Sequence, residues 1–122
     1  MQQKRVVITG IGMVTPLGND VATTWQNLLQ GKSGADQISH FDASRFKTQF
    51  ACEVKSLDMS AIFDQKEMRR YDRYIHYAVK SADEAIRDAQ INIEEENALR
   101  YGVIYGSGMG GVNTLDTNIG GF

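Results

Sequence analysis

The clearest pattern in the sequence is a pair of short, continuously apolar runs, one near each end of the chain. Residues 5–9 read RVVIT and residues 101–108 read YGVIYGSG. Runs that are apolar at nearly every position and rich in β-branched residues are typical of strands covered on both faces, as in a parallel sheet. We therefore predict two buried strands, each leading into a glycine-rich turn.

The first helical pattern follows the turn GIGMVTPLGN. Asn19 or Asp20 can cap this helix, and Gly31 stands where a left-handed residue commonly ends one. Its apolar stripe consists of Val21, Trp25, Leu28 and Leu29. Residues 32–56 lack helical periodicity and are expected to form a loop with short extended pieces, and a short helical turn is expected near residues 60–63.

The longest helical pattern predicts a single helix over residues 65–89. Its apolar stripe consists of Met68, Tyr71, Ile75, Ala78, Val79, Ala82, Ala85, Ile86 and Ala89. Asp64 is followed three residues later by Glu67, which predicts a capping box at the start of this helix. A further helical turn is expected within residues 91–100.

The order of strand, helix, loop, long helix and strand predicts an α/β fold with parallel strands joined by crossover helices. Two strands make a poor sheet, and no predicted element follows the second strand to cover it. We therefore expect residues 1–122 to be the N-terminal segment of a larger enzyme.

Composition and charge narrow the class of protein. The chain is 42% hydrophobic and 23% charged, like an ordinary globular protein, and its net charge of −2 argues against a general nucleic-acid binder. Cys52 is the one cysteine and cannot form an internal disulfide, so we expect a cytoplasmic protein. No apolar run is long enough to span a membrane, and the interrupted apolar start predicts a strand rather than a signal peptide.

The second predicted strand runs into GSGMGG, where Gly106, Gly108 and Gly111 match the dinucleotide fingerprint G-x-G-x-x-G. A dinucleotide site also needs the loop to open a helix, and an acidic residue about twenty positions further on. Only eleven residues follow Gly111, so we expect neither feature. The first turn, TGIGMVT, has Thr15 where the third glycine should stand. We therefore favour close approach of these glycines to a substrate or another backbone over nucleotide binding.

Four segments together resemble the beginning of a β-ketoacyl-acyl-carrier-protein synthase. They are KRVVITGIGMVTPLGN, the W, LL and GKSG that follow it, DRYIHYAVKSADEAIRDA, and VIYGSGMGG. They fit the elongating form of type II fatty-acid synthesis, often called KAS II, better than its relatives. The resemblance covers residues 4 to about 111, and the tail after Val112 carries no motif.

The resemblance implies a thiolase-like fold, in which two similar α/β halves each supply a sheet sandwiched by helices, and a homodimeric enzyme. Such an enzyme transfers an acyl chain to a cysteine, decarboxylates malonyl-carrier protein and joins the two by Claisen condensation. The implied partner is acyl carrier protein, and no cofactor is implied. The family's nucleophilic cysteine and two histidines match no position of this chain, so we expect the isolated segment to be inactive.

The cysteine and histidines of the chain have structural interpretations. Cys52 matches no nucleophile motif and is expected to be a small, half-buried thiol. His40 lies in the predicted loop, and His76 lies beside the apolar stripe of the long helix. With no paired nucleophile and base, and no His/Cys cluster at metal-ligand spacing, we predict no catalytic residue and no metal ligand.

The resemblance assigns substrate-binding roles to Gly108 and Met109. In the family, the residue after G-S-G lines the mouth of the acyl-chain pocket and acts as a gate. A branched aliphatic residue occupies that position in a family member, whereas methionine is unbranched and flexible, which leaves chain-length preference open. The alternative is that Met109 is ordinary core filler.

A basic face is predicted at the start of the long helix. If Lys66 is set to zero, Arg69 falls at about −60°, Arg70 at about +40° and Arg73 at about −20°, opposite the apolar stripe. Cations near a helix N-terminus oppose the macrodipole, by about 0.3–1 kcal/mol each. A solvated charged face is the ordinary interpretation. Because the matching positions of KAS II enzymes contact the acidic carrier, we expect these four cations to form a carrier-docking face.

Three alternatives stay open. A KAS I or polyketide ketosynthase has the same fold, and substrate profiling would separate these from KAS II. A small non-catalytic binding domain for nucleotide or protein would fold alone and unfold cooperatively. A nicotinamide oxidoreductase would bind a dinucleotide through residues 106–111, and it ranks last.

Overall fold

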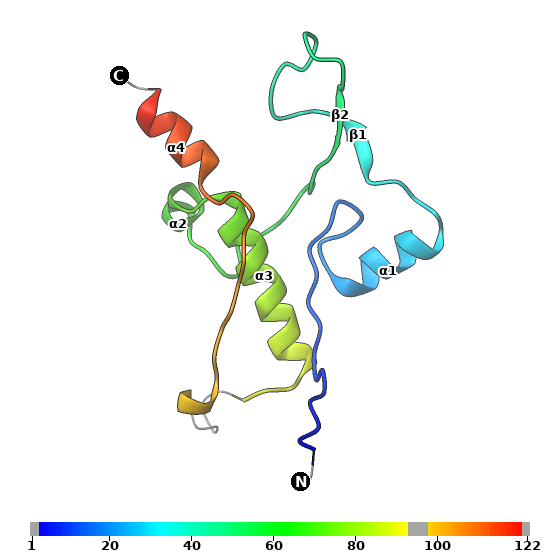
Figure 1. Cartoon of the computed structure of the whole chain (residues 1–122), viewed down its shortest axis with the longest axis vertical. Helices are drawn as coiled ribbons and strands as arrows, with labels where there is room; N and C mark the ends of the chain where they lie inside the picture. Colours follow the sequence, from blue (N-terminus) through cyan, green and yellow to red (C-terminus); the bar gives the residue numbers. More distant parts are fainter. Residues whose placement is uncertain (1–2, 93–97, 121–122) are drawn as a thin grey trace.

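The computed structural model describes residues 3–92 and 98–120. Its elements follow one another as α1 (Val21–Leu29), β1 (Ala35–Gln37), β2 (Phe50–Cys52), α2 (Gln65–Arg70), α3 (Arg73–Asp88), a 3₁₀ turn (Ala98–Arg100) and α4 (Val112–Ile119). Helix α3 lies at the centre of the molecule, with the strands beyond one end of it and α1 and α4 on opposite sides (Figure 1). None of the described helices is long and apolar enough to cross a membrane.

Helix α1 confirms the expected caps. Asp20 is the N-cap residue, and one of its carboxylate oxygens accepts a hydrogen bond from the Thr23 backbone N–H at 2.7 Å. Gly31, just past the helix, has φ +66, the left-handed conformation that glycine adopts without strain. The apolar stripe is not covered, however, because Trp25 is 58% exposed and Leu29 is 67% exposed.

The loop expected over residues 32–56 does contain two short extended pieces. Strands β1 and β2 pair antiparallel, with Asp36 opposite Ala51. Residues 60–62 form a turn, in which the Ile62 and Phe63 backbone N–H groups both donate to the Met59 carbonyl. Within the described residues β1 and β2 form the one sheet, so the predicted parallel sheet is not present there.

The two predicted strands are extended but unpaired. Val6 is 94% exposed near the start of the chain, and Ile104 is 100% exposed near its end. The second segment lies along α3, whereas the first runs on beyond the C-terminal end of α3, and neither joins a ladder (Figure 1). The prediction of buried strands is therefore wrong for this chain, because a strand needs a neighbour to receive its hydrogen bonds and no described residue supplies one.

The single helix predicted over residues 65–89 is also wrong. Helix α2 ends at Arg70 and α3 begins at Arg73, because Tyr71 and Asp72 take extended conformations with ψ of 135° and 154°. The predicted capping box of Asp64 and Glu67 is confirmed, but it starts a helix of only six residues. The Asp72 carbonyl accepts from the Ile75 N–H at 2.9 Å, which begins a new helix at the break.

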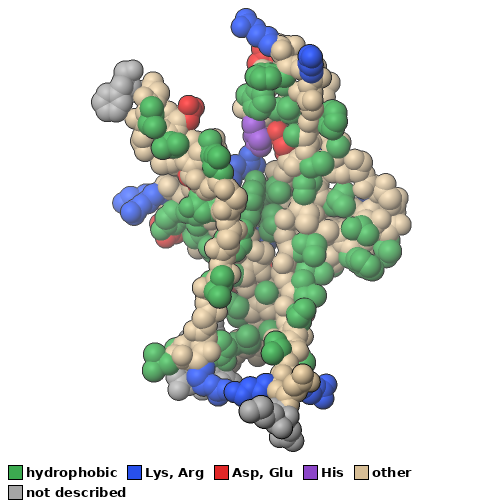
Figure 2. All heavy atoms as spheres, viewed as in Figure 1, with side chains coloured by type: hydrophobic (Ala, Val, Ile, Leu, Met, Phe, Trp, Pro, Cys, Tyr) green, Lys and Arg blue, Asp and Glu red, His purple; other side chains and the backbone are tan. Residues whose placement is uncertain are grey.

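Little of the chain is buried. Among the described hydrophobic residues only Ala43 and Met59 are buried, at 9% and 1% exposure. The molecule exposes 10643 Å², whereas a compact monomer of 13.6 kDa would expose about 6,600 Å². Figure 2 shows hydrophobic side chains spread along both extended segments rather than gathered inside. The elements thus form a framework around α3 and not a closed core.

Candidate functional site

The first glycine turn is pressed against α3. A Cβ on Gly10 would lie 2.2 Å from the Ala85 carbonyl oxygen, and one on Gly12 would lie 1.8 Å from the Ser81 carbonyl oxygen. No real Cβ contact is that short, so only glycine fits at either position. Of the two explanations for these glycines, close approach to another backbone is the correct one here.

Two carboxylates of α3 hold the same turn in place. Asp88 accepts from the Ile11 backbone N–H at 2.9 Å. Glu84 accepts from the Met13 N–H and, with its other oxygen, from the Val21 N–H that opens α1, both at 2.9 Å. One side chain of α3 therefore joins the turn to the first helix. Sequence reasoning missed this clamp, although two acidic residues at i and i+4 beside an apolar stripe are a readable signal.

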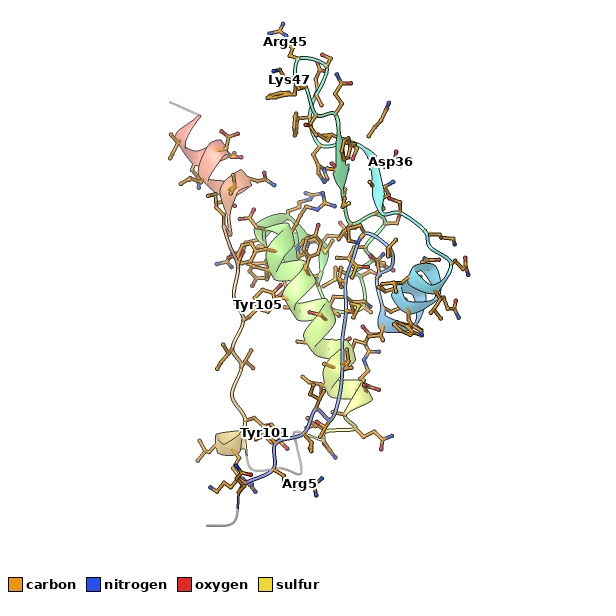
Figure 3. All side chains as sticks on the ribbon, turned by 45° about the vertical axis from the view of Figure 1, so that its right-hand side comes forward. Arg5, Asp36, Arg45, Lys47, Tyr101 and Tyr105 are labelled. Atoms are coloured by element: carbon orange, nitrogen blue, oxygen red, sulfur yellow. The ribbon has the colours of Figure 1, made fainter. Side chains whose placement is uncertain are left out.

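The second glycine loop is open over its first half. A Cβ on Gly106 or Gly108 would meet nothing within 4 Å. Met109 is 80% exposed, so it does not act as core filler among the described residues. Figure 3 shows the preceding extended segment, on which Tyr105 is labelled, running up to this loop and on into α4.

The second half of the loop is anchored at the start of α3. A Cβ on Gly110 would lie 3.0–3.2 Å from the ring of Tyr74. Gly111 has φ +73 and is the N-cap residue of α4. In the first turn of α4 the Thr114 hydroxyl donates to the Asp72 carboxylate at 2.8 Å. Sequence reasoning did not single out Asp72, Tyr74 or Thr114, because their contacts span about forty positions along the chain.

A helix therefore does follow the glycine loop, contrary to expectation. Residues 112–119 were assigned no motif, yet they form α4 directly after Gly111. A glycine in the left-handed conformation turns the chain into the helix without side-chain strain. The presence of α4 removes one of the two objections to a dinucleotide site. The choice between a dinucleotide site and close approach to a substrate or another backbone therefore rests on the family to which the chain belongs.

The four predicted docking cations divide into two groups. The side chains of Lys66, Arg69 and Arg70 are exposed, and none of them pairs with another side chain of the described residues. Arg69 and Arg70 lie in the last turn of α2, where a cation stabilises the helix dipole. The expectation that these two cations oppose the helix dipole is thus wrong. The four cations also do not share one arc of a single helix, because α2 ends at Arg70.

Arg73 differs because its guanidinium is engaged within the chain. It lies 2.8 Å from His40 Nε2 and donates to the Val54 carbonyl at 3.2 Å, which ties α3 to the end of β2. His40 Nε2 is also 3.7 Å from a carboxylate oxygen of Glu53. The Ser39 hydroxyl, donating to Glu53 at 2.6 Å, is the main cause that lowers the pKa of that carboxyl.

The remaining predicted residues have these positions. His76 is buried, and the centroid of its ring lies 5.4 Å from that of Phe63, which agrees with a structural role. Cys52 is exposed on β2, so the expected half-buried thiol is wrong. Neither histidine hydrogen-bonds to Cys52, and the described part of the chain holds no group of acidic, histidine or cysteine side chains arranged for a metal ion.

A groove of about 300 Å³ lies beside the cations of α2. Its lining is largely apolar and includes Met59, Phe63 and Met68, together with the charged residues Asp58 and Arg69. Because Arg69 belongs both to this lining and to the exposed cations, a partner that met the cations would also meet the groove. The chemistry available at this face is therefore a set of exposed cations next to a largely apolar groove that also carries the Asp58 carboxylate.

Comparison with known proteins identifies relatives over nearly the whole chain. Residues 3–119 match the family described as "Beta-ketoacyl synthase, N-terminal domain". The chain is 47% identical over 94% of its length to 3-oxoacyl-(acyl-carrier-protein) synthase 2 of Staphylococcus aureus (strain COL). It is 48% identical over 97% of its length to the protein of that name from Coxiella burnetii, and 43% identical over 95% to that from Vibrio harveyi.

The chain spans 28% of the length of each of these curated relatives. A solved structure, described as the ishigamide ketosynthase/chain length factor, superposes with a TM-score of 0.64 at 30% identity. That superposition covers 73% of this chain and 22% of the other. The expected thiolase-like α/β fold is thereby confirmed, with this chain as a part of it, and the chain belongs to the beta-ketoacyl synthase family as its N-terminal domain.

Proposed function

We propose that the complete protein is a 3-oxoacyl-(acyl-carrier-protein) synthase that elongates acyl chains by decarboxylative Claisen condensation with malonyl-carrier protein. The supporting observation is the family match over residues 3–119 together with 43–48% identity to relatives of that name. The proposal includes a cytoplasmic homodimer. The nucleophilic cysteine and the two histidines would be supplied by the remainder of the protein.

The direct test uses the full-length protein with malonyl- and acyl-carrier protein. We expect formation of a 3-oxoacyl-carrier product two carbons longer than the acyl donor, with release of one CO₂ per product. Omission of the malonyl substrate is the control. A protein that binds the carrier but forms no 3-oxoacyl product would contradict the assignment.

Within that enzyme, Met109 is proposed to gate the acyl pocket, with Gly108 allowing the backbone to approach the substrate. The exposed position of Met109 on an open loop supports a side chain that moves. Met109→Ala should broaden acceptance of long acyl chains, measured as acylation rates across donors of graded length. Leu115→Ala on α4, another exposed apolar residue, is the matched control. An unchanged length profile for Met109→Ala would rule out the gate.

The cations Lys66, Arg69, Arg70 and Arg73 are proposed to receive the acidic carrier. Support comes from the lack of side-chain partners for the three on α2 among residues 3–92 and 98–120, and from the adjacent, largely apolar groove. Reversal of Arg69 and Arg70 to glutamate should raise the KM for acyl-carrier protein and spare a small carrier-free thioester. The difference should shrink with salt, because the Debye length falls from about 10 Å at 0.1 M to about 3 Å at 1 M.

Arg45 and Lys47 provide a charge-matched control. They lie at the far end of the loop between β1 and β2, away from α2 (Figure 3). Their reversal to glutamate changes the net charge equally but should leave the carrier KM unchanged. Equal effects of both double reversals would indicate general electrostatics and not a docking face.

A polyketide ketosynthase is the second candidate, and the superposition on the ishigamide ketosynthase/chain length factor favours it. That structure is 30% identical to this chain, whereas the synthase 2 relatives are 43–48% identical. Fatty-acid elongation is therefore preferred. Turnover of saturated acyl donors in preference to polyketide intermediates is the measurement that separates the two.

A further inference from the structure

The second glycine loop is free at one end and fixed at the other. In the described part of the chain, nothing lies within 4 Å of a Cβ placed on Gly106 or Gly108, whereas Gly110 lies against the ring of Tyr74 and Gly111 faces the Asp72 carboxylate. The loop that carries Met109 is therefore held at the start of α3, beside Tyr74 and Asp72.

Asp72 behaves unlike the other aspartates that begin helices in this chain. Asp20 and Asp64 each accept hydrogen bonds from backbone N–H groups of their own helix. Asp72 occupies the same N-cap position of α3 but makes no such bond. Its carboxylate instead accepts from the Thr114 hydroxyl at 2.8 Å, 42 residues away along the chain. A side-chain cap stabilises a helix, so α3 lacks that contribution while Asp72 holds α4.

Asp72 also lies in the segment of chain that connects the proposed docking cations. It follows Arg70 by two residues and directly precedes Arg73. Tyr71 and Asp72 form the extended break between α2 and α3. A displacement of α2 is therefore transmitted to α3 through these two residues. A displacement of Asp72 moves the acceptor of the Thr114 hydroxyl.

We propose that Asp72 is a positioning residue that links the carrier-docking face to the Met109 loop through Thr114. The bond from Thr114 fixes the start of α4, and with it the fixed end of the glycine loop. A docked carrier that shifts the α2–α3 junction changes the resting position of Met109. This inference rests on the proposed condensing activity and adds a route from carrier binding to substrate selection.

The test uses four variants of the full-length enzyme, three at Thr114 and Thr117 and one at Asp72. Thr114→Val keeps the shape of the side chain but removes the donor, and Thr114→Ser keeps the donor. Thr117→Val is the matched control, because the Thr117 hydroxyl bonds only within α4, to the Asn113 carbonyl at 2.8 Å. Acylation rates are measured for donors of graded length, carried either by acyl carrier protein or by a small thioester.

For Thr114→Val we expect the ratio of long-chain to short-chain acylation by carrier-bound donors to change by about 2- to 30-fold. The same ratio of long-chain to short-chain acylation should change less for small-thioester donors, because no carrier is docked at the α2–α3 junction. Thr114→Ser and Thr117→Val should both keep the wild-type ratios. Asp72→Asn, which retains an acceptor oxygen, should fall between Thr114→Val and wild type.

Two results overturn the inference while leaving the proposed function intact. One is a wild-type length profile in Thr114→Val. The other is an equal change in Thr114→Val and Thr117→Val, which would indicate a general effect on α4. A wild-type enzyme that forms no 3-oxoacyl product overturns the proposed function and this inference together, so the failures are distinguishable.

Discussion

The two glycine turns read almost alike, TGIGMV after residues 5–9 and YGSGMGG at the end of the second extended segment, yet their surroundings are opposite. Gly10 and Gly12 are pressed against carbonyl groups of α3, whereas Gly106 and Gly108 face open space. Glycine in the first turn is required by packing. In the second turn, packing among the described residues does not require glycine at Gly106 or Gly108, whereas Gly110 and Gly111 are held against the start of α3.

The helices that follow the two turns differ in the same sense. Helix α1 begins at Asp20, whose carboxylate accepts from Thr23 in its own first turn, and Glu84 fixes the Val21 N–H from outside. Helix α4 begins at Gly111 with no side-chain cap of its own. One turn is thus locked on both sides, and the other is held only at its far end. Four substitutions or conditions test this difference.

The largest effect is expected for Gly12→Ala. The added methyl group would meet the Ser81 carbonyl oxygen, a backbone atom that cannot rotate away, so destabilisation should reach or exceed about 3 kcal/mol. Gly106→Ala, with nothing nearby, should stay within about 0.5 kcal/mol. Urea unfolding of the full-length protein measures both. Equal midpoints for the two variants would show that the turns do not differ as described.

Removal of the Glu84 carboxylate should have the next largest effect. Glu84→Ala leaves the Met13 and Val21 N–H groups without their acceptor in a partly buried place, which should cost about 1–3 kcal/mol. Asp88→Ala frees a single, exposed N–H of Ile11 and should cost less. The same unfolding experiment ranks them, and an effect of Asp88→Ala as large as that of Glu84→Ala would argue against the clamp.

A smaller effect is expected at the fixed end of the second loop. Gly111→Ala places a Cβ at φ +73, and the left-handed conformation should cost about 1–2 kcal/mol. Gly111→Asn should cost less, since asparagine tolerates this conformation. Gly108→Ala, earlier in the same loop, is the comparison for the free energy of unfolding. If Gly108→Ala proved as destabilising as Gly111→Ala, the loop would be fixed at both ends.

The smallest effect is expected from acidification, which should weaken the Asp20 cap of α1. The Thr23 backbone N–H, donating to Asp20, is the main cause that lowers the pKa of Asp20 below its usual value of 3.8. A lowered pKa means that the cap stabilises the folded state above pH 3.8, and that this contribution is lost as pH falls through the lower value. Hydrogen exchange of the Thr23 amide should therefore accelerate, relative to its intrinsic rate, as the solution is acidified.

The Leu115 amide in α4, which bonds to the Gly111 carbonyl, is the internal reference and should change less. Asp20→Asn keeps an acceptor oxygen but does not titrate, so its Thr23 amide should lose the acid dependence. If both amides lost protection in parallel, or if Asp20→Asn behaved as wild type, the cap would not be the cause.

Features decided by neighbouring residues were predictable from the sequence. The caps at Asp20 and Asp64 and the left-handed Gly31 follow from side chains acting on their own backbone, and all three are confirmed. The short extended pieces within residues 32–56 are also confirmed, as two strands that pair with each other. The family was also recognisable, because its motifs are ordered along the chain.

Features decided by distant residues were not predictable. The apolar stripe continues across Tyr71, so periodicity alone joins α2 to α3, and the partner that draws the Asp72 carboxylate away is Thr114. The expected strands failed because composition indicates a covered strand without supplying its neighbours. At the candidate site, the glycine loop was located correctly, but its anchor was missed. The roles of Met109 and the docking cations stay predictions.

The unpaired extended segments have a consequence for handling this chain by itself. Neither pairs with a strand of the described residues, so each presents backbone N–H and C=O groups flanked by exposed β-branched side chains, which is the surface that templates intermolecular β-pairing and aggregation. Lys4 and Arg5 directly precede Val6 and act as charged gatekeepers for the first segment, whereas Val103 and Ile104 follow Arg100 at a distance of three and four residues. Self-association of the isolated chain should therefore begin at the second segment, and a lysine in place of Ile104 should delay it.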